Sequence, residues 1–514
     1  MTLRRIALAG LALLAFQVGL KAADPAAKVV RYEDFGAKGD GKTDDFAAIV
    51  AAHDYANQHK LPVRADDQAE YYIGGANKTA VVKTDTDFGK ARFVIDDTAV
   101  ENRVAPVFSV VSDLKSFKPE GITRLKQNQA KVEGTFPGPC LITVKDANVK
   151  RYIRYGINAN PGSPQTDIFI VDKDGNVDMN APIIWDFDQI TEINALPMDE
   201  QQLTVTGGRF TTIANRETGP HKYYARGLSI RRSNVVVDGL EHRVIETEGQ
   251  SFPYTGFINV SDSANVTVKN TVLTGRKLYY TVKPDSKSTT TGTYDISVTR
   301  ALNVSFINCS QTNDILDPVY WGIMGSNYCK NLLYDGCKLS RFDAHMGVAN
   351  ATIRNSTLGY LGINAIGFGT LTIENSTCMA RTMVNLRSDY GSTWQGKFII
   401  RNSVFIPGGG AKMSASVIGG QNLGNHNFGY VCYMPEVIEI DGLLIKDGNH
   451  PDPYSGAAVL GNFNPNWKDA SFKEEFPYVK TREIILRNIK TESGKALRLS
   501  DNPVMFGDVK VIKE

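Results

Sequence analysis

The segments NATIRN (residues 350–355) and TLTIEN (residues 370–375) decide the fold of this chain, because they repeat one pattern twenty residues apart. In each segment apolar residues alternate with polar ones, as in a strand with one buried face, and an Asn follows. The pattern recurs in NVVVDG (234–239), NVTVKN (265–270), NVSFIN (303–308), NLLYDG (331–336), KFIIRN (397–402), VIEIDG (437–442) and EIILRN (483–488). A strand and a polar turn residue that recur about every 20 residues or more are the signature of a solenoid. The sequence therefore predicts a parallel β-helix.

One Asn or Asp marks each repeat: Asp238, Asn270, Asn308, Asp335, Asn355, Asn375, Asn402, Asp441 and Asn488, in steps of 20 to 47 residues. If these markers share one corner of each coil, the shortest steps are bare coils and the longer steps are coils that carry loops. Loops inserted on one side of a solenoid build the walls of an elongated groove. A groove of that shape suits a polymer.

The composition excludes a strong positive field for nucleic acid or an anionic membrane, because the net charge is only +2. The N-terminus is typical of a cleavable signal peptide: Arg4 and Arg5 precede an apolar stretch (6–20), and Ala22-Ala23 forms a small-residue cleavage site. No other segment comes close to a membrane span. We therefore expect a secreted or periplasmic monomer that is not inserted in a membrane.

Six cysteines follow the signal peptide: Cys140, Cys309, Cys329, Cys337, Cys378 and Cys432. An oxidising destination permits disulfides, but solenoid interiors also stack free Cys as small apolar residues. Because four of the six lie in or beside the repeat strands, we expect mostly unpaired cysteines in the core. No Cys or His spacing indicates a zinc site.

The segment at residues 29–63 has the order strand, Gly-rich turn (36–41) and helix. The helix is expected from about Asp45 to His59, and Asp44 or Asp45 can cap its start. Such a helix over the open end of a β-helix prevents edge-to-edge pairing.

Within that segment, DFGAKGDGKTDDFAAI (34–49) resembles the N-terminal cap motif of the pectate-lyase-like superfamily. This group includes polysaccharide lyases, polygalacturonases, some glucanases, sugar epimerases and phage tailspikes. With the repeats, the resemblance covers the chain after the signal peptide apart from one insertion. It implies an all-β, right-handed, single-stranded parallel β-helix that acts on a polysaccharide. It does not select a reaction, because the cap motif is shared across all those chemistries.

The insertion is expected at residues 105–203, where the coil rhythm breaks and VDKDGNVDM (171–179) is typical of a hairpin. We interpret it as a mostly β subdomain, either a wall of the groove or a structural embellishment. The predicted organisation is a signal peptide (1–23), an N-terminal cap with the first coils (24–104), the inserted subdomain (105–203) and a parallel β-helix with the catalytic groove (204–514).

The strands about ten residues upstream of the markers should share one face, with equivalent outward residues about 5 Å apart per coil. Four candidate catalytic residues fall into one strip in this arrangement: Tyr320, His345, Asn364 and Arg387. The candidate substrate-binding residues beside the strip are Arg341, Asp343, Asn385, Tyr390 and Trp394.

The segment SRFDAHMGV (340–348) is the strongest candidate for a catalytic segment, because Asp343 is placed to orient His345. A His positioned by a carboxylate can act as a general base or acid near neutral pH. Each residue also has a structural alternative: a surface His with local hydrogen bonds, packing of Tyr320 beside Trp321, an amide ladder through Asn364, or a charged cover by Arg387.

The first reaction class is β-elimination on a uronic-acid polymer, which requires neutralisation of the sugar carboxylate, removal of the adjacent proton and protonation of the leaving oxygen. Arg387 and Asn364 could hold the carboxylate, His345 could be the base, and Tyr320 the acid or a shared base. Calcium, which some β-helix lyases use, could be held by Asp295, Asp314, Asp317 and Asp343. These four form no compact cluster in the sequence, so no residue is assigned as a metal ligand.

Three alternatives stay open. Glycoside hydrolysis usually needs two flanking carboxylates, which would come from the same four Asp residues; NDILD (313–317) only loosely resembles the polygalacturonase pattern. Uronate epimerisation is the next, because FDAHM (342–346) is similar to the Asp-Pro-His element of alginate epimerases, with Ala344 in place of Pro. Glycan binding without catalysis is the last, through exposed aromatic residues such as Tyr360, Tyr390 and Trp394. We expect a lyase of an acidic polysaccharide first and a hydrolase second.

Overall fold

The computed structural model describes residues 29–156, 159–217, 223–245, 253–274, 279–282, 288–291, 293–318, 320, 324–408, 414–420, 428, 430–450, 453–476 and 478–514. The predicted signal peptide lies outside these residues. Within the described ranges, no helix is long and apolar enough to cross a membrane.

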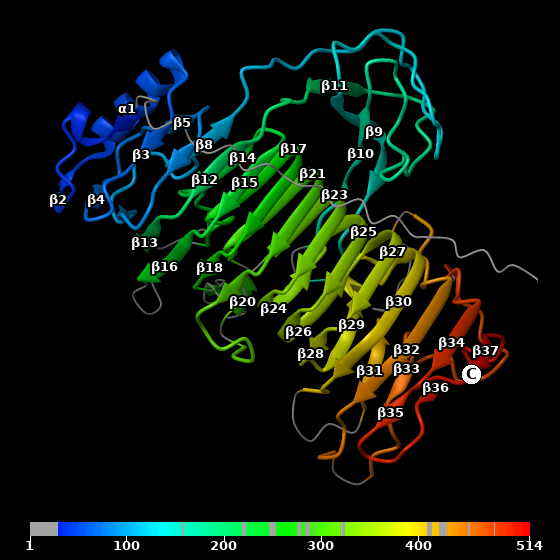
Figure 1. Ribbon diagram of the computed structural model, residues 1–514. Coiled ribbons are helices and arrows are strands. Elements are labelled where there is room, and N and C mark those ends of the chain that lie inside the picture. The colour runs from blue at the N-terminus through cyan, green and yellow to red at the C-terminus, as the bar shows by residue number, and fades with distance from the viewer. Residues whose placement is uncertain are drawn as a thin grey trace, which may run out of the picture.

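Thirty-two strands form one sheet that winds along the molecule, and every recorded pairing within it is parallel, which confirms the predicted all-β parallel β-helix (Figure 1). The first coils contain β1 (Val30–Arg31), β2 (Asp40–Asp44), β3 (Val63–Arg64), β4 (Glu70–Ile73), β5 (Ala80–Val82), β6 (Thr86–Asp87), β7 (Arg92–Asp96) and β8 (Phe108–Val111). The next coils contain β12 (Leu203–Thr206), β13 (Arg209–Ile213), β14 (Leu228–Arg231), β15 (Val235–Asp238), β16 (Glu241–Ile245), β17 (Ile258–Lys269) and β18 (Val272–Leu273).

The later coils hold the remaining strands of this sheet. They are β21 (Ile296–Ile307), β22 (Ser310–Gln311), β23 (Met324–Asp335), β24 (Lys338–Asp343), β25 (Met346–Arg354), β26 (Thr357–Ala365), β27 (Gly367–Glu374), β28 (Thr377–Cys378), β29 (Thr382–Leu386), β30 (Trp394–Phe405), β31 (Ser416–Gly419), β32 (Val437–Ile445), β33 (Ala458–Leu460), β34 (Glu483–Arg487), β35 (Lys490–Thr491), β36 (Arg498–Ser500) and β37 (Lys510–Lys513). A separate hairpin pairs β19 (Tyr279–Val282) with β20 (Ser288–Thr291).

All nine repeat segments contribute to strands, and each segment finishes at a residue with a left-handed backbone. The residues in this column are Gly239, Asn270, Asn308, Gly336, Asn355, Asn375, Asn402, Gly442 and Asn488, with φ between 44° and 77°. Gly and Asn adopt this conformation at low cost, which explains why they recur there.

The predicted markers Asp238, Asp335 and Asp441 are wrong by one residue. Asp335 pairs with Arg354, so the residue after it, Gly336, aligns with Asn355. In these three repeats the Gly, which tolerates a positive φ most easily, takes the column position, and the Asp precedes it. Asp335 still supports the ladder, because its Oδ1 accepts a hydrogen bond of 2.8 Å from Asn355 Nδ2.

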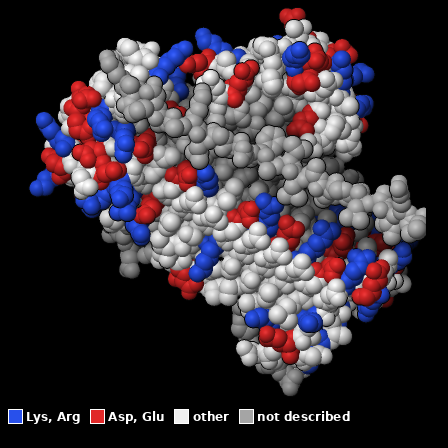
Figure 2. Space-filling model, in the orientation of Figure 1, with Lys and Arg blue, Asp and Glu red and all other residues white. Residues whose placement is uncertain are grey.

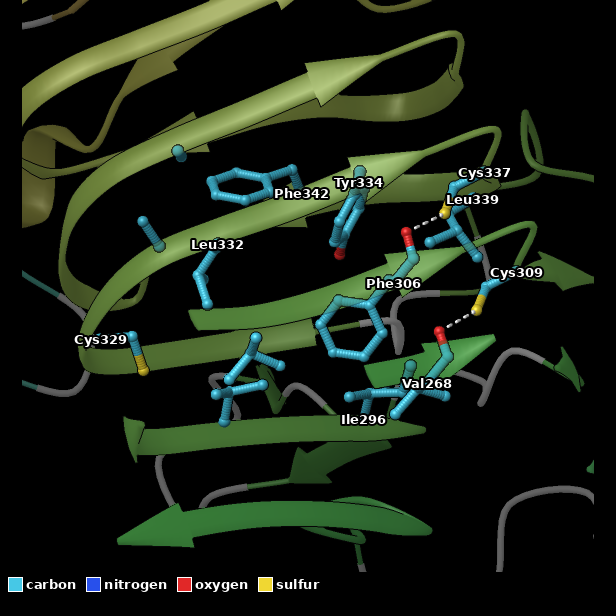
Figure 3. Close-up of a cluster of buried hydrophobic side chains, with 14 of the residues drawn as sticks. Val268, Ile296, Phe306, Cys309, Cys329, Leu332, Tyr334, Cys337, Leu339 and Phe342 are labelled. Carbon is cyan, nitrogen blue, oxygen red and sulfur yellow. Dashed lines mark hydrogen bonds between the residues drawn. The ribbon is translucent and has the colours of Figure 1, made fainter. Parts of the chain in front are cut away.

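The interior of the coils is a continuous stack of apolar side chains, part of which Figure 3 shows around β21, β23 and β24. Phe306, Tyr334 and Phe342 stack edge to face with ring centroids 5.6 and 5.4 Å apart. The thiols of Cys309 and Cys337 donate to the backbone oxygens of the preceding coil, at 3.4 and 3.2 Å. All six cysteines are buried and carry free thiols, so they fill the core as small apolar residues.

The predicted N-terminal helix is α1 (Phe46–His59), and its apolar side packs over the first coils. Asp44 caps it, because its Oδ1 accepts a 3.0 Å hydrogen bond from the Phe46 amide. Asp45 instead accepts hydrogen bonds from Lys38 and Gly39, at 2.6 and 3.0 Å, and so holds the Gly-rich turn.

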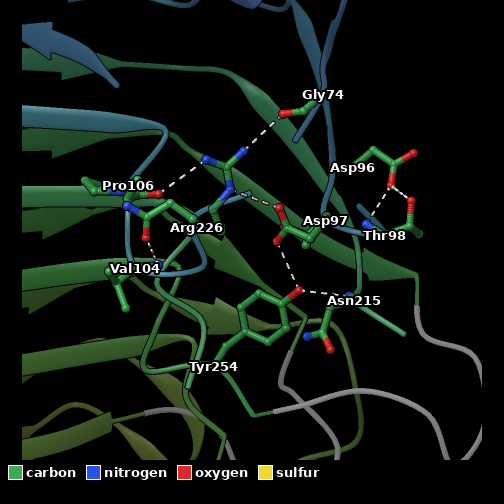
Figure 4. A network of polar contacts seen from close by, with 12 residues as sticks. Gly74, Asp96, Asp97, Thr98, Val104, Pro106, Asn215, Arg226 and Tyr254 are labelled. Carbon is green, nitrogen blue, oxygen red and sulfur yellow. Dashed lines mark hydrogen bonds and ion pairs between the residues drawn. The ribbon is translucent and has the colours of Figure 1, made fainter. Parts of the chain in front are cut away.

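A buried polar network joins the first coils to the coils that follow them (Figure 4). The Arg226 guanidinium lies 3.1 Å from Asp97 Oδ1 and donates to the Gly74 backbone oxygen, also at 3.1 Å. The Tyr254 hydroxyl donates to Asp97 Oδ2 at 3.0 Å. Because Arg226 and Asp97 are fully buried, each charge depends on these partners.

Three strands between β8 and β12 form a separate antiparallel sheet with its own apolar core: β9 (Cys140–Arg151), β10 (Ser163–Val171) and β11 (Glu192–Pro197). After them, β12, β13 and β14 pair with β6, β7 and β8, so the coil rhythm resumes where it stopped. A buried ion pair of 2.7 Å between Asp167 of β10 and Lys330 of β23 fixes this inserted sheet to the coils. The predicted bounds, 105–203, include β8 and the first residue of β12, which belong to the coils; we call residues 112–202, between these two strands, the inserted subdomain.

On the face shown in Figure 2, basic and acidic side chains alternate and no large patch of one sign forms. This agrees with the net charge of +2.

Candidate active site

The candidate site lies at a corner where three strands of successive coils end. β24, β26 and β29 pair in register through Asp343, Asn364 and Asn385. Two residues beyond each, His345, Ile366 and Arg387 therefore take equivalent positions at the corner. His345 and Arg387 thus share one corner, with one coil between them.

His345 is half-buried at this corner and is held on both ring nitrogens. Nδ1 lies 3.1 Å from Asn327 Oδ1, and Nε2 lies 3.5 Å from the Tyr390 hydroxyl. Because a carbonyl oxygen only accepts, Nδ1 carries the hydrogen and Nε2 keeps its lone pair. Burial, and then the positive charge of Arg387, lower the pKa of His345 to about 4. At neutral pH the imidazole is therefore an unprotonated base.

Arg387 is the centre of an ion-pair network around His345. Its guanidinium lies 3.4 Å from Asp343 and 2.7 Å from Asp389. Burial acts to lower the pKa of Arg387, but the charges of Asp343 and Asp389 outweigh it and raise that pKa. Burial likewise acts to raise the pKa of Asp389, whereas the hydrogen bond and charge of Arg387 hold it below its ordinary value. Both groups are therefore charged at neutral pH.

Two further arginines complete the network. Arg154, from the inserted subdomain, lies 2.9 Å from Asp389 Oδ2, and its guanidinium is 5.5 Å from the centre of the Tyr390 ring. Arg341 lies 3.1 Å from Asp343 Oδ2. Three guanidiniums thus face two carboxylates, which leaves an excess of positive charge beside His345.

A polar groove of about 750 Å³ borders this corner. It begins at Asn364, Asn385 and Ser388 and continues over the coils toward Asn462 and Asp501. Its length crosses successive coils, as a groove for a polymer requires.

The predicted strip of four catalytic residues is only partly correct. Asn364 aligns with Asp343 rather than with His345, because the register between β24 and β26 shifts by two residues between Leu339 and Arg341. The Asn364 side chain accepts a 2.8 Å hydrogen bond from Asn385, an amide ladder that borders the groove. Tyr320 follows a turn, with its amide bonded to the Asp317 oxygen, and no contact recorded in the described ranges joins it to His345.

Several candidate substrate-binding residues are less accessible than predicted. Trp394 and Tyr390 are 0% and 1% exposed, so the prediction that they are exposed aromatic platforms is wrong. Trp394 points into the core and donates to the Gly369 oxygen, and Tyr390 is covered by the corner. Arg341 and Asp343, 2% and 1% exposed, serve in the ion-pair network and lie off the groove surface. Tyr360 is 43% exposed and lines the groove.

The acidic candidates do not assemble into a site. Asp295 is fully buried just before β21 and lies 3.6 Å from Nδ1 of His242 in β16. Asp314 is exposed in a turn, where it accepts a hydrogen bond from the Leu316 amide. Among the residues described, no group of three or more His, Cys, Asp or Glu is placed to hold a metal ion.

Three residues of the corner were missed from the sequence. Asn327 pairs opposite Met346, next to His345, in the register that also aligns Asn331 with Asn350, so the repeat spacing could have found it. Arg154 lies in an insertion with no repeat pattern and cannot be aligned with His345 from spacing. Asp389 could have been found, because it follows Arg387 by two residues in the run MVNLRSDY (383–390).

Comparison with known proteins supports the fold. No family model matches the chain. Over 127 residues it is 28% identical to a capsule KL64-specific depolymerase of Klebsiella phage P510, a match that covers 20% of this chain and 12% of that protein. The tailspike gp61 of Pseudomonas phage phi297 is similar over 94% of this chain and 83% of its own, with 14% identity and a TM-score of 0.54. The tailspike gp49 of Pseudomonas phage LKA1 is similar over 94% and 84%, with 13% identity and a TM-score of 0.52. At these identities the two tailspikes show a likeness of fold.

Proposed function

We propose that the protein is an exported lyase that cleaves an acidic, uronic-acid-containing polysaccharide by β-elimination. The observation that carries the proposal is His345, a neutral imidazole with an unprotonated Nε2 beside an excess of guanidinium charge, at a corner whose neighbouring residues Asn364, Asn385 and Ser388 line a polar groove. The capsule depolymerase that shares a segment of sequence supports a polysaccharide as the substrate.

In this reaction His345 is the base. Nε2 takes the proton from carbon 5 of the uronate, the electrons of that bond form the C4=C5 double bond, and the C4–O bond breaks. The leaving oxygen then takes up a proton, which the imidazolium can return. Asn327 fixes the tautomer that places the lone pair on Nε2; this lone pair faces the buried Tyr390 hydroxyl at 3.5 Å and exchanges that contact for the substrate proton.

The arginines stabilise the charge that develops on the sugar carboxylate when the proton leaves. Arg387 and Arg154 are 14% and 20% exposed, so the edge of each guanidinium can face a ligand. Their carboxylate partners keep them in place before substrate binds, which is the preorganisation that such stabilisation requires.

Glycoside hydrolysis is the second candidate, because Asp343 and Asp389 both flank Arg387. A hydrolase needs one carboxylic acid with a raised pKa to protonate the leaving oxygen. Arg387 instead holds the pKa of Asp389 below its ordinary value, and Asp343 is buried between two guanidiniums. These contacts favour elimination over hydrolysis.

The test is incubation of the purified protein with pectins, alginates, chondroitin and dermatan sulfates, hyaluronan, heparinoids and bacterial capsular polysaccharides, with and without a chelator. We expect new ultraviolet absorbance from a conjugated double bond with at least one acidic polymer. New reducing ends without that absorbance would establish hydrolysis instead. If neither absorbance nor new reducing ends appear with any polymer, a depolymerising activity is contradicted. If the absorbance is lost when the chelator is added, part of the neutralisation of the sugar carboxylate is assigned to a metal.

A further inference from the structure

A second cavity, of about 220 Å³, lies across the corner from the polar groove, between the inserted subdomain and the starts of β27 and β30. Five aromatic side chains line it: Tyr152, Trp185, Phe368, Tyr430 and Tyr433. We call it the aromatic pocket. Rings on several walls of a small cavity provide flat apolar faces, which suit the C–H faces of a sugar ring.

The aromatic pocket is joined to the candidate active site. The Tyr430 hydroxyl donates to the backbone oxygen of Tyr390 at 2.8 Å, and Tyr390 in turn contacts His345. Ile366, which lies between His345 and Arg387 at the corner, also lines the pocket. The corner therefore separates a polar groove on one side from an aromatic pocket on the other.

Arg151 supplies the charge of the pocket. Its guanidinium stacks 4.0 Å from the centre of the Trp185 ring and bonds to Gln165 Oε1 at 2.7 and 3.0 Å. Burial lowers its pKa, and its recorded partners within the described residues include no carboxylate. It differs in this from Arg154, Arg341 and Arg387, each of which has an Asp partner.

We infer that the aromatic pocket seats one acidic sugar of the substrate, with the ring against the aromatic side chains and its carboxylate paired with Arg151. A planar guanidinium stacked on an aromatic ring is well suited to bind a carboxylate through two hydrogen bonds. The inference rests on the proposed function, because it assumes a uronate polymer as the substrate. It adds a specific role for the inserted subdomain, which provides Arg151, Tyr152 and Trp185.

The test uses monosaccharides, which have no linkage to cleave: glucuronate, galacturonate and mannuronate, each against its neutral hexose. Binding is measured by Trp fluorescence and by ligand-observed NMR on the full chain. Two variants act on the pocket: Arg151→Gln removes the charge, and Val431→Trp fills the rim from a position that is 58% exposed. Val504→Trp, at an exposed position outside both cavities, is the matched control.

We expect at least one uronate to bind about tenfold more tightly than its hexose, as a charge-assisted pair provides. Arg151→Gln should remove that preference, Val431→Trp should weaken both sugars, and Val504→Trp should change neither. The inference is overturned if no uronate is preferred, if the preference survives Arg151→Gln, or if Val431→Trp binds as the unmodified protein does.

The two proposals fail separately. If uronates bind in this way but no double bond forms with any polymer, the proposed lyase activity is overturned and the proposed sugar site in the aromatic pocket stands. If both Arg151→Gln and Val431→Trp catalyse elimination with unchanged kcat and KM, the proposed sugar site in the aromatic pocket is overturned and the proposed lyase activity stands.

Discussion

His345 is an unprotonated base at neutral pH because its surroundings oppose a positive charge. Burial comes first, and the guanidiniums of Arg387 and Arg154 add to it, so the pKa falls to about 4. We expect kcat/KM for double-bond formation to stay level as the pH falls from 7 and to drop only near pH 4, whereas an ordinary His would lose activity near pH 6.5. A pH–rate profile on one acidic polymer measures this.

A charge variant sharpens the pH experiment. Arg154→Gln removes one of the charges that lower the His345 pKa, so the acidic limb should move upward; Arg92→Gln, a distant surface arginine on β7, should leave it in place. A limb near pH 6.5 in the unmodified protein would show that His345 is not the group observed. The lowered pKa of His345 also makes the stability depend on pH. Between about pH 6.5 and 4 the unfolded chain binds a proton at this His and the folded chain does not, so the free energy of unfolding decreases as the pH falls.

Only part of this site could be predicted from the sequence, because some of its residues follow the repeat spacing and others do not. Asp343 and His345 lie in one coil and Arg387 lies two coils further on, within reach of the repeat spacing, and all three meet in the corner network. Tyr320 was aligned through a turn of uncertain length, which spacing does not resolve. Arg154 enters from the inserted subdomain, whose docking depends on packing that has no repeat pattern.

At the level of the strand, the left-handed column gives a test of why the repeats end in Asn or Gly. Asn375 is exposed, has φ of 48° and closes one of the shortest coils. We expect Asn375→Ala to lower the free energy of unfolding by about 1 to 2 kcal/mol, because a Cβ without a compensating polar group disfavours this conformation. Asn375→Gly should cost less, because Gly adopts a positive φ freely.

Chemical denaturation of the three proteins measures the difference. Lys338→Ala, an exposed change on β24 in the preceding coil, is the control and should be near neutral. Equal stability of Asn375→Ala and Asn375→Gly would show that backbone conformation does not explain the pattern.

The fold was predictable at this scale because each coil repeats the same local requirement. Apolar alternation placed the nine segments in strands, and DFGAKGDGKTDDFAAI placed the helix that covers the first coil. The one-residue error at Asp238, Asp335 and Asp441 arose because Asp resembles Asn in polarity, whereas the backbone selects Gly for its conformation.

Over the whole molecule, the inserted subdomain is held on the coils by a buried ion pair that also positions Arg151 and Arg154. Lys330 and Asp167 are 2% and 1% exposed, and Lys330 Nζ also donates to the Pro182 oxygen. We expect Lys330→Met to destabilise the protein by about 3 to 5 kcal/mol, because Asp167 would be left as an unpaired buried charge. Activity should fall with it, since the subdomain supplies Arg154.

Denaturation and polymer turnover, measured together, check this prediction. The double variant Lys330→Met with Asp167→Leu should recover most of the stability, because an apolar pair can replace a buried ion pair. Lys338→Met, at an exposed lysine, should change neither quantity. Unchanged stability in the single Lys330→Met variant would show that the ion pair does not hold the subdomain.

The most direct test of the central claim is the rate of double-bond formation by the unmodified protein and by His345→Ala on the same acidic polysaccharide at pH 7. If His345 removes the proton, that rate should fall by about 10² to 10⁴-fold, while circular dichroism stays unchanged. Elimination that continues at the original rate in His345→Ala, or cleavage that yields only saturated products in the unmodified protein, would contradict the account.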